Sequence, residues 1–416
     1  MSRQTTRRTV RKRRYWGDDD ASALTKWPKK ALHKTWLVLE SNYVNVLLVF
    51  VPLGIISAHV GWSPTVVFVL NFLAIIPLAA LLSFATEEIS AKLGQTLGGL
   101  MNATFGNAVE LIVSIIALKE NEIRVVQSSM LGSILSNILL VLGCCFLAGG
   151  LNPANGSEQT FNITVASTMS SLMAVASASL IVPATLYAQL ENSKEKTEGN
   201  ILILSHGTAI ILLLLYGLYL FFQLKSHANL FDAEAQVEEE EEEHILDPWG
   251  ATAALLIVTI LVAVCADYLV ESIDDIVKTT GISKTFIGLI LLPIVGNAAE
   301  HVTACVVAYK NKMDLAINVA IGSSLQIALF VTPFLVILGW IMGRDMTLHF
   351  ETFETVVFFV SVLVVNYLIQ DGKSNYLEGA MCLGTYIIIA IAFYVYPDDA
   401  GDKTNGFFGG RLFGTS

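Results

Sequence analysis

Charged residues are scarce in this sequence. Of its 416 residues, 15% are Asp, Glu, Lys or Arg, whereas 54% are apolar, and the mean hydropathy is +0.62. Because a soluble chain carries about 25% charged residues, this composition excludes an ordinary soluble enzyme. The apolar residues occur in long runs, which predict a protein that crosses a membrane several times.

Motifs of hydrolytic chemistry are absent as well. Neither HExxH nor GxSxG occurs, and Glu300 and His301 are adjacent, which turns them to different faces of a helix. Five cysteines lie in apolar runs, without CxxC spacing or a histidine partner at ligand distance: Cys144, Cys145, Cys265, Cys305 and Cys382. We interpret them as small core residues rather than disulfides or zinc ligands. We expect no enzyme, no cofactor and no nucleic-acid partner.

The net charge of −11 is unevenly distributed. Residues 1–40 contain 11 Lys and Arg against 4 Asp and Glu, and the remaining chain contains 14 against 32. The basic tail has no apolar segment with a cleavage site, so it is not a secretory signal peptide. It predicts a cytosolic N-terminus, because positive charge beside the first span favours the cytosolic side.

Eleven segments are apolar and long enough to cross about 30 Å of hydrocarbon. They lie near residues 41–60, 64–84, 98–118, 126–150, 161–188, 200–223, 249–272, 285–309, 314–342, 351–370 and 376–396. We therefore expect an all-α polytopic membrane protein with eleven transmembrane helices. An odd number of crossings puts the C-terminal tail, residues 398–416, on the lumenal side, although the charges of the later loops do not favour this orientation.

A strongly acidic segment, residues 224–248, joins the sixth and seventh spans. Its nine acidic residues are offset only by Lys225, and they include the consecutive run Glu238, Glu239, Glu240, Glu241, Glu242 and Glu243. One interpretation is a solvated, self-repelling linker. The other is a regulatory segment near the cytosolic mouth that attracts Ca²⁺.

An internal repeat organises the chain. Gly106-Asn-Ala-Val-Glu110 recurs as Gly296-Asn-Ala-Ala-Glu300, and the same offset superposes Gly132-Ser-Ile-Leu-Ser136 on Gly322-Ser-Ser-Leu-Gln326. Five crossings separate the copies, so they point in opposite directions through the membrane. This predicts two inverted five-helix halves, residues 61–223 and 249–397, with residues 41–60 as an extra helix. Such halves suit transport by alternating access.

The repeated motifs offer oxygen donors only. The candidate ligands are Asn107, Glu110, Ser133, Ser136, Asn137, Asn297, Glu300, Ser323 and Gln326. Oxygen ligands suit Ca²⁺ or Mn²⁺, whereas zinc and copper prefer thiolate or imidazole. The alternative is that the serines and amides only join helices by hydrogen bonds.

Hydrogen bonding between helices does not explain Glu110 and Glu300, because placing a carboxylate inside the membrane costs roughly 2.5–3.5 kcal/mol. If the two meet near the midplane, at least one holds a proton unless a cation pairs with both. Ca²⁺ and H⁺ then compete for the same oxygens, which is the property of an antiporter. Glu87, Asp267 and His301 are weaker candidates for a proton path.

At these motifs the sequence resembles the H⁺/Ca²⁺ exchanger (CAX) family of the Ca²⁺/cation antiporter superfamily, most of all its fungal vacuolar members. The resemblance runs from about residue 41 to 398. It implies one extra helix plus two inverted five-helix repeats, with an acidic cytosolic helix between them. It also implies that Ca²⁺ moves from the cytosol into an acidic organelle, the vacuole, in exchange for H⁺.

Other functions remain open at this point. Exchange of Ca²⁺ against Na⁺, with or without K⁺, and exchange of Mn²⁺ against H⁺ use similar oxygen ligands. A channel is disfavoured because channels build rings of ligands along a pore. The H⁺:Ca²⁺ ratio and the oligomeric state do not follow from the sequence.

Overall fold

The computed structural model describes residues 33–40, 42–156, 158–190, 197–231 and 245–396. The chain divides into two units, Met1–Tyr43 and Val44–Ser416. In the first unit, residues 33–40 form a helix. The run Glu238 to Glu243, most of the basic tail and the C-terminal tail lie outside the described residues.

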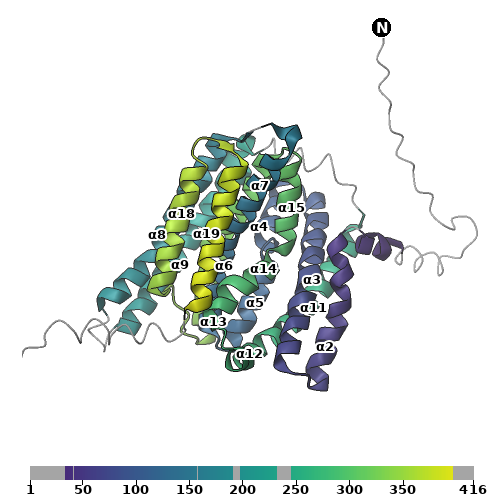
Figure 1. Ribbon diagram of the computed structural model, residues 1–416, viewed down its shortest axis with the longest axis vertical. Coiled ribbons are helices and arrows are strands. Elements are labelled where there is room, and N and C mark those ends of the chain that lie inside the picture. Colours follow the sequence, from purple (N-terminus) through teal and green to yellow (C-terminus); the bar gives the residue numbers. More distant parts are fainter. Residues whose placement is uncertain (1–32, 41, 157, 191–196, 232–244, 397–416) are drawn as a thin grey trace, which may run out of the picture. The chain divides into compact units, whose positions relative to one another are not determined.

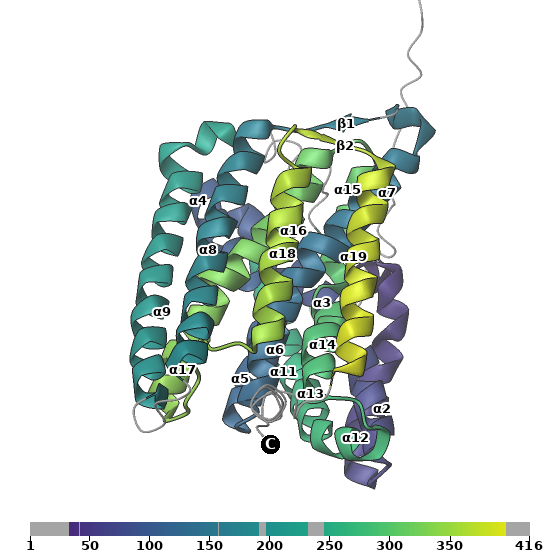
Figure 2. The ribbon, with the colours of Figure 1, turned by 60° about the vertical axis from the view of Figure 1, so that its left-hand side comes forward.

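From Tyr43 onward, the described chain is built almost entirely from helices (Figures 1 and 2). In chain order the helices are η1 (Tyr43–Val49), α2 (Phe50–Val60), α3 (Pro64–Leu93), α4 (Gln95–Phe105), α5 (Ala108–Lys119), α6 (Ile123–Leu135), η2 (Ser136–Val141), α7 (Leu142–Leu151), η3 (Pro153–Asn155), α8 (Ile163–Leu190), α9 (Thr197–Phe221), η4 (Phe222–Ser226), η5 (Ala228–Leu230), α11 (Pro248–Glu271), α12 (Ile273–Thr280), α13 (Lys284–Phe286), η6 (Ile287–Leu291), α14 (Leu292–Gly296), α15 (Ala298–Tyr309), α16 (Met313–Gln326), η7 (Ile327–Val331), α17 (Thr332–Met342), α18 (Thr352–Leu368) and α19 (Tyr376–Val395). Strands β1 (Gln159–Thr160) and β2 (Lys373–Ser374) form one antiparallel pair.

Among the described residues, eight helices are long and apolar enough to cross a membrane. A ninth candidate is the bent pair Lys284–Gly296 and Ala298–Tyr309, whose halves meet at 57°. Thr352–Leu368 is a shorter apolar helix. The protein is therefore a multi-pass membrane protein, since each long helix satisfies its backbone hydrogen bonds internally.

The local backbone structure repeats with the same residue offset as the sequence motifs. Asn121 and Asn311 each have a φ of 63° and lie two residues after the last residue of α5 and of α15, respectively. In each copy the next residue donates its backbone N–H to the end of the helix: Glu122 to the Ala117 carbonyl, and Lys312 to the Val307 carbonyl. Asparagine tolerates this left-handed conformation better than most residues. The π-helical segments η2 and η7 also occupy corresponding positions.

The interior of the unit is formed where elements from the two parts of the chain pack together. Helix α3 packs along α11, α6 packs against η6, and α7 packs against both α15 and α19. Many of the outward side chains are large and apolar, including Ile257 and Ile388. Such an exterior suits hydrocarbon rather than water.

The helices that carry the repeated motif run in opposite directions. Figures 1 and 2 show α4 above α5, whereas α14 lies below α15. The chain therefore descends from α4 to α5 and ascends from α14 to α15. Each path is interrupted at its glycine and asparagine, which brings two helix breaks into the interior.

Candidate ion-binding site

Two helix breaks form the framework of the candidate site. Helix α4 ends at Phe105 and α5 begins at Ala108, while α14 ends at Gly296 and α15 begins at Ala298. Asn107 and Asn297 occupy the N-cap positions of α5 and α15, with non-helical dihedral angles. A broken helix presents carbonyls at one end and N–H groups at the other inside the membrane, where both ends interact with ions.

Both carboxylates lie in the first turn after a break. Glu110 belongs to the first turn of α5 and is buried, and Glu300 belongs to the first turn of α15. A β-carbon added to Gly296 would lie 2.6 Å from Glu110 Oε1. The motif glycine of the second copy thus leaves room for the carboxylate of the first.

A polar cavity of about 190 Å³ lies beside Glu300. Its lining comes from α3, from both breaks and from α16: Ser83, Thr86, Glu87, Asn102, Gly106, Glu300, Thr303, Asn318, Val319, Ser323 and Gln326. Glu110 instead lines a narrower, mainly apolar pocket together with Ser114, Ser129, Ser133 and Gly296. The two acids therefore border different spaces.

The charges of the two acids are close enough to interact. Glu300 experiences the charges of Glu110 and Glu87. Its Oε2 atom is buried, and it has no hydrogen-bond partner among the described residues; the same holds for Oδ1 of Asn297. A buried oxygen without a donor is costly, and a cation would satisfy it. Ca²⁺ takes such carboxylate and amide oxygens as ligands.

The two motif asparagines make reciprocal contacts with the other half of the chain. Asn107 donates to Gln326 Oε1 at 2.6 Å and accepts from the Ser323 hydroxyl at 2.7 Å. Asn297 donates to the Ser133 backbone carbonyl at 3.4 Å. Because Ser133 and Ser323 occupy the same position of the repeat, each break bonds the corresponding helix of the opposite copy.

Of the remaining predicted residues, Ser136, Asn137 and Asp267 lie away from the two cavity linings. Ser136 is beside the Tyr386 hydroxyl of α19. Asn137 is fully buried, and its amide atoms have no hydrogen-bond partner in the described part of the chain. Asp267 pairs with Lys119 at 3.6 Å. Glu87 lies in the cavity with Glu300, where it accepts a hydrogen bond from Ser83.

The structure adds residues that the motifs did not indicate. Thr86, Asn102, Thr303 and Asn318 line the cavity of Glu300. Thr303 could have been recognised, because three positions after Glu300 is the same face of a helix. Thr86 and Asn102 lie outside the repeated motifs, and no spacing in the sequence relates them to Glu300.

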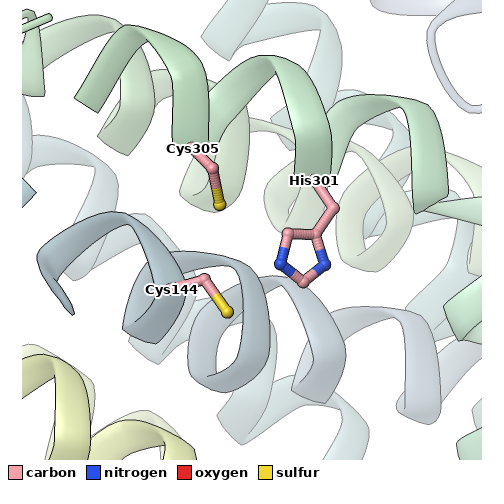
Figure 3. A group of neighbouring side chains, drawn as sticks. All are labelled: Cys144, His301 and Cys305. Carbon is pink, nitrogen blue, oxygen red and sulfur yellow. The ribbon is translucent and has the colours of Figure 1, made fainter. Parts of the chain in front are cut away.

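The expectation that no histidine lies at ligand distance is wrong for two of the cysteines. Cys144 of α7 and Cys305 of α15 lie beside His301, and the three ligand atoms are within 4.8 Å of one another (Figure 3). A histidine therefore does lie at ligand distance. His301 and Cys305 are four residues apart, a spacing that places both on one helix face, but only the fold brings Cys144 to them. Cys265 and Cys382 are buried in the core as expected.

Comparison with known proteins agrees with this geometry. The family described as sodium/calcium exchanger protein matches residues 63–225 and 250–395. A vacuolar calcium ion transporter of Schizosaccharomyces pombe is 55% identical over 360 residues, which are 86% of each chain. A Ca²⁺/H⁺ antiporter of Aphanothece halophytica is 44% identical over 84% of this chain and 96% of its own.

Solved structures share the arrangement of the helices. The structure of native YfkE has a TM-score of 0.73 and 38% identity, and the match covers 85% of this chain and all of YfkE. The match of the family includes both helix breaks and both carboxylates. It confirms the family expected from the repeated motifs: the chain belongs to the sodium/calcium exchanger protein family.

Proposed function

We propose that the protein is a secondary active antiporter that moves Ca²⁺ out of the cytosol into an acidic compartment in exchange for H⁺. Glu110 and Glu300 bind Ca²⁺ and H⁺ competitively and face the two sides of the membrane alternately. One observation carries this proposal: the acids follow breaks in oppositely running helices, and the carboxylate of one half lies against the motif glycine of the other. The chain is accordingly a transporter and not an enzyme.

The donors around the breaks support a hard divalent cation. Carboxylate, amide and hydroxyl oxygens line the cavity beside Glu300. We assign ligand roles to Asn107, Asn297, Ser133, Ser323 and Gln326 next to the two glutamates. Ser136 and Asn137 belong to a second layer, because they follow the ligand-bearing turn of α6 without lining either space. Glu87 is the proton acceptor at the mouth of the cavity, whereas Asp267 and His301 take no direct part.

The fold proposed for this function has eleven transmembrane helices. To the eight long helices and the bent pair α14 and α15 it adds α18 and the pair α4 and α5, which corresponds to α14 and α15 in the repeat. Residues 41–60 are the extra helix, and residues 61–223 and 249–397 are inverted halves. The opposite directions of α5 and α15 in Figures 1 and 2 support this arrangement.

The compartment follows from the relatives. The names of several relatives describe vacuolar transporters, from Schizosaccharomyces pombe and from plants. We therefore place the protein in the vacuolar membrane as a multi-pass protein, with a cytosolic N-terminus, a cytosolic acidic linker and a lumenal C-terminus. The basic tail supports this orientation.

Proton coupling is favoured over Na⁺ or K⁺ coupling by the names of the relatives, which include a Ca²⁺/H⁺ antiporter and cation/proton exchangers. Mn²⁺ shares the oxygen chemistry of Ca²⁺ and remains the second candidate substrate.

For the acidic linker we propose that it attracts cations at the cytosolic mouth, because the end of the linker is attached to α3. Glu88 of α3 accepts hydrogen bonds from the backbone N–H groups of Ile245 and Leu246.

Uptake into proteoliposomes that are acidic inside tests the function. Antiport predicts Ca²⁺ uptake that collapses when a protonophore removes the gradient, and Glu110→Gln or Glu300→Gln abolishes it. Glu158→Gln is the control, because this acid lies in a loop and pairs with Lys373. Uptake that persists without a proton gradient, or that requires Na⁺, contradicts the proposal. Mn²⁺ in place of Ca²⁺ measures selectivity.

A further inference from the structure

The thiols of Cys144 and Cys305 and the imidazole of His301 form a compact group outside the oxygen-lined cavity. Their ligand atoms all lie within 4.8 Å of one another. Figure 3 shows the three side chains pointing toward one another, Cys144 from α7 and the other two from α15. All three side chains are partly exposed. Cys145 adds a further thiol that interacts with Cys305.

This group has the chemistry of a site for thiophilic cations. Zn²⁺ binds thiolate sulfur at about 2.3 Å and imidazole nitrogen at about 2.0–2.1 Å, with tetrahedral geometry. Those bond lengths place neighbouring ligand atoms roughly 3.5–3.8 Å apart. The three groups thus lie at most about 1 Å beyond binding distances, which is within the reach of small rotations of the side chains.

Packing does not require these residue types. The corresponding positions of the other repeat are Leu111, Ile115 and Phe334, all apolar. The same helix surface can therefore be built without a thiol or an imidazole. The cluster is a feature of one half only, which separates it from the ion pathway that both halves share.

The donors also differ in kind from those of the transport site. Glu300 and its neighbours offer oxygen, which suits Ca²⁺, whereas sulfur and imidazole select Zn²⁺, Cd²⁺ or similar ions. His301 is next to Glu300 in sequence, yet it faces α7 while Glu300 faces the cavity. A cation at the cluster would join α7, in the first half, to α15, the helix that carries Glu300.

We propose that Cys144, His301 and Cys305 bind one thiophilic divalent cation, Zn²⁺ or Cd²⁺, and that the bound ion inhibits exchange by fixing α15 to α7. Binding transfers the two thiol protons to water, because the thiolates are the ligands. The inhibition, though not the binding, depends on the proposed transport function. Alternating access needs the elements of the two halves to move relative to each other, and an ion bound across them prevents this.

Binding is tested with the purified full-length protein in detergent, reduced with a phosphine. Titration with Cd²⁺ in the presence of excess Ca²⁺ is expected to produce thiolate-to-cadmium charge-transfer absorption at one ion per chain. Cys144→Ser and Cys305→Ser should each weaken binding roughly tenfold or more, whereas Cys265→Ser, which removes a buried thiol elsewhere in the core, should not. If Cys144→Ser and Cys305→Ser both give the same absorption as the wild-type protein, the proposal is overturned.

Transport provides the second readout. Micromolar Zn²⁺ or Cd²⁺ should slow Ca²⁺ uptake by wild type and by Cys265→Ser, and Ca²⁺ in excess should not relieve the inhibition. Cys144→Ser and Cys305→Ser should retain basal uptake and lose the inhibition. Inhibition that persists in both variants and yields to Ca²⁺ places the ion at the carboxylates and refutes the inhibitory cluster. The absorption titration of Glu300→Gln separates the two proposals, because the cluster binds Cd²⁺ even if that acid proves unrelated to transport.

Discussion

Asn107 and Gln326 are 219 positions apart in the sequence, and a hydrogen bond of 2.6 Å joins their side chains. Asn107 also accepts from Ser323, so one amide connects the break of the first half to α16 of the second. Asn107→Ala removes the partner of Ser323, which is buried, and of Gln326, which is partly buried; an unsatisfied buried polar group costs about 1–3 kcal/mol. We expect at least a tenfold loss of Ca²⁺ uptake at limiting Ca²⁺. Asn297→Ala, which removes one bond of 3.4 Å, should cost less; equal losses would contradict this ranking.

A substitution at Gly296 tests the contact between this glycine and the Glu110 carboxylate. A methyl group there would lie 2.6 Å from Glu110 Oε1, so Gly296→Ala must displace the carboxylate. We expect uptake to fall to near background while the protein remains folded and monodisperse. In Gly384→Ala nothing described lies within 4 Å of the new methyl group, and alanine favours a helix. Normal transport by Gly296→Ala would show that the position of Glu110 does not matter.

A buried ion pair stabilises one end of the helix bundle. Arg124 donates to both carboxylate oxygens of Glu354, at 3.0 and 2.6 Å, and to the Thr285 hydroxyl at 3.1 Å. Glu354 is fully buried, so Arg124→Ala leaves its charge unpaired and should lower the free energy of unfolding by about 3–5 kcal/mol. Lys278→Ala breaks an exposed pair with Asp275 and should cost less than about 1 kcal/mol. Thermal unfolding in detergent measures both; equal shifts would disprove the distinction.

Ca²⁺ itself should stabilise the protein. A ligand that binds only the folded state at a hundred times its dissociation constant adds about 2.7 kcal/mol. The unfolding temperature should therefore rise with Ca²⁺, and this rise should disappear in Glu300→Gln. Protons compete for the same carboxylates, so the rise should shrink as the pH falls. A Ca²⁺ effect that is independent of pH, or unchanged in Glu300→Gln, would place the ion elsewhere.

The end of the acidic linker is attached at α3. Glu88 is almost fully buried and accepts two backbone hydrogen bonds, from Ile245 at 2.8 Å and from Leu246 at 3.1 Å, and Lys92 donates to the Leu246 carbonyl. Glu88→Ala should release this segment and accelerate proteolysis just before α11. Glu87→Ala, at the neighbouring position, serves as the control, since it lines the cavity instead. Equal cleavage of both variants would contradict the attachment.

Much of this architecture could be predicted because its signals are local. Long apolar runs locate the helices, and a single register relates Gly106 to Gly296 and Glu110 to Glu300. The same register extends to Asn121 and Asn311, which share a left-handed backbone conformation.

Contacts between the halves could not be predicted, because they depend on how helices pack. The sequence could not indicate that Asn107 bonds the second half while Ser136 lies beside Tyr386. The histidine neighbour of Cys144 could not be predicted for the same reason, because His301 is distant in the sequence and reaches Cys144 only through the packing of α7 against α15. Predictions about the six glutamates lie outside the described residues.

The reciprocal contacts of the two asparagines are unequal: Asn107 holds two short bonds and Asn297 one long bond. If the two halves exchange roles during transport, as proposed, this inequality makes the two conformations different. The mirror conformation would give Asn297 the hydroxyls of Ser133 and Ser136, leaving Asn107 with a backbone carbonyl. Since Ser136 stands where the second copy has Gln326, the two resting states differ in energy, and the protein should wait for Ca²⁺ mostly on one side of the membrane.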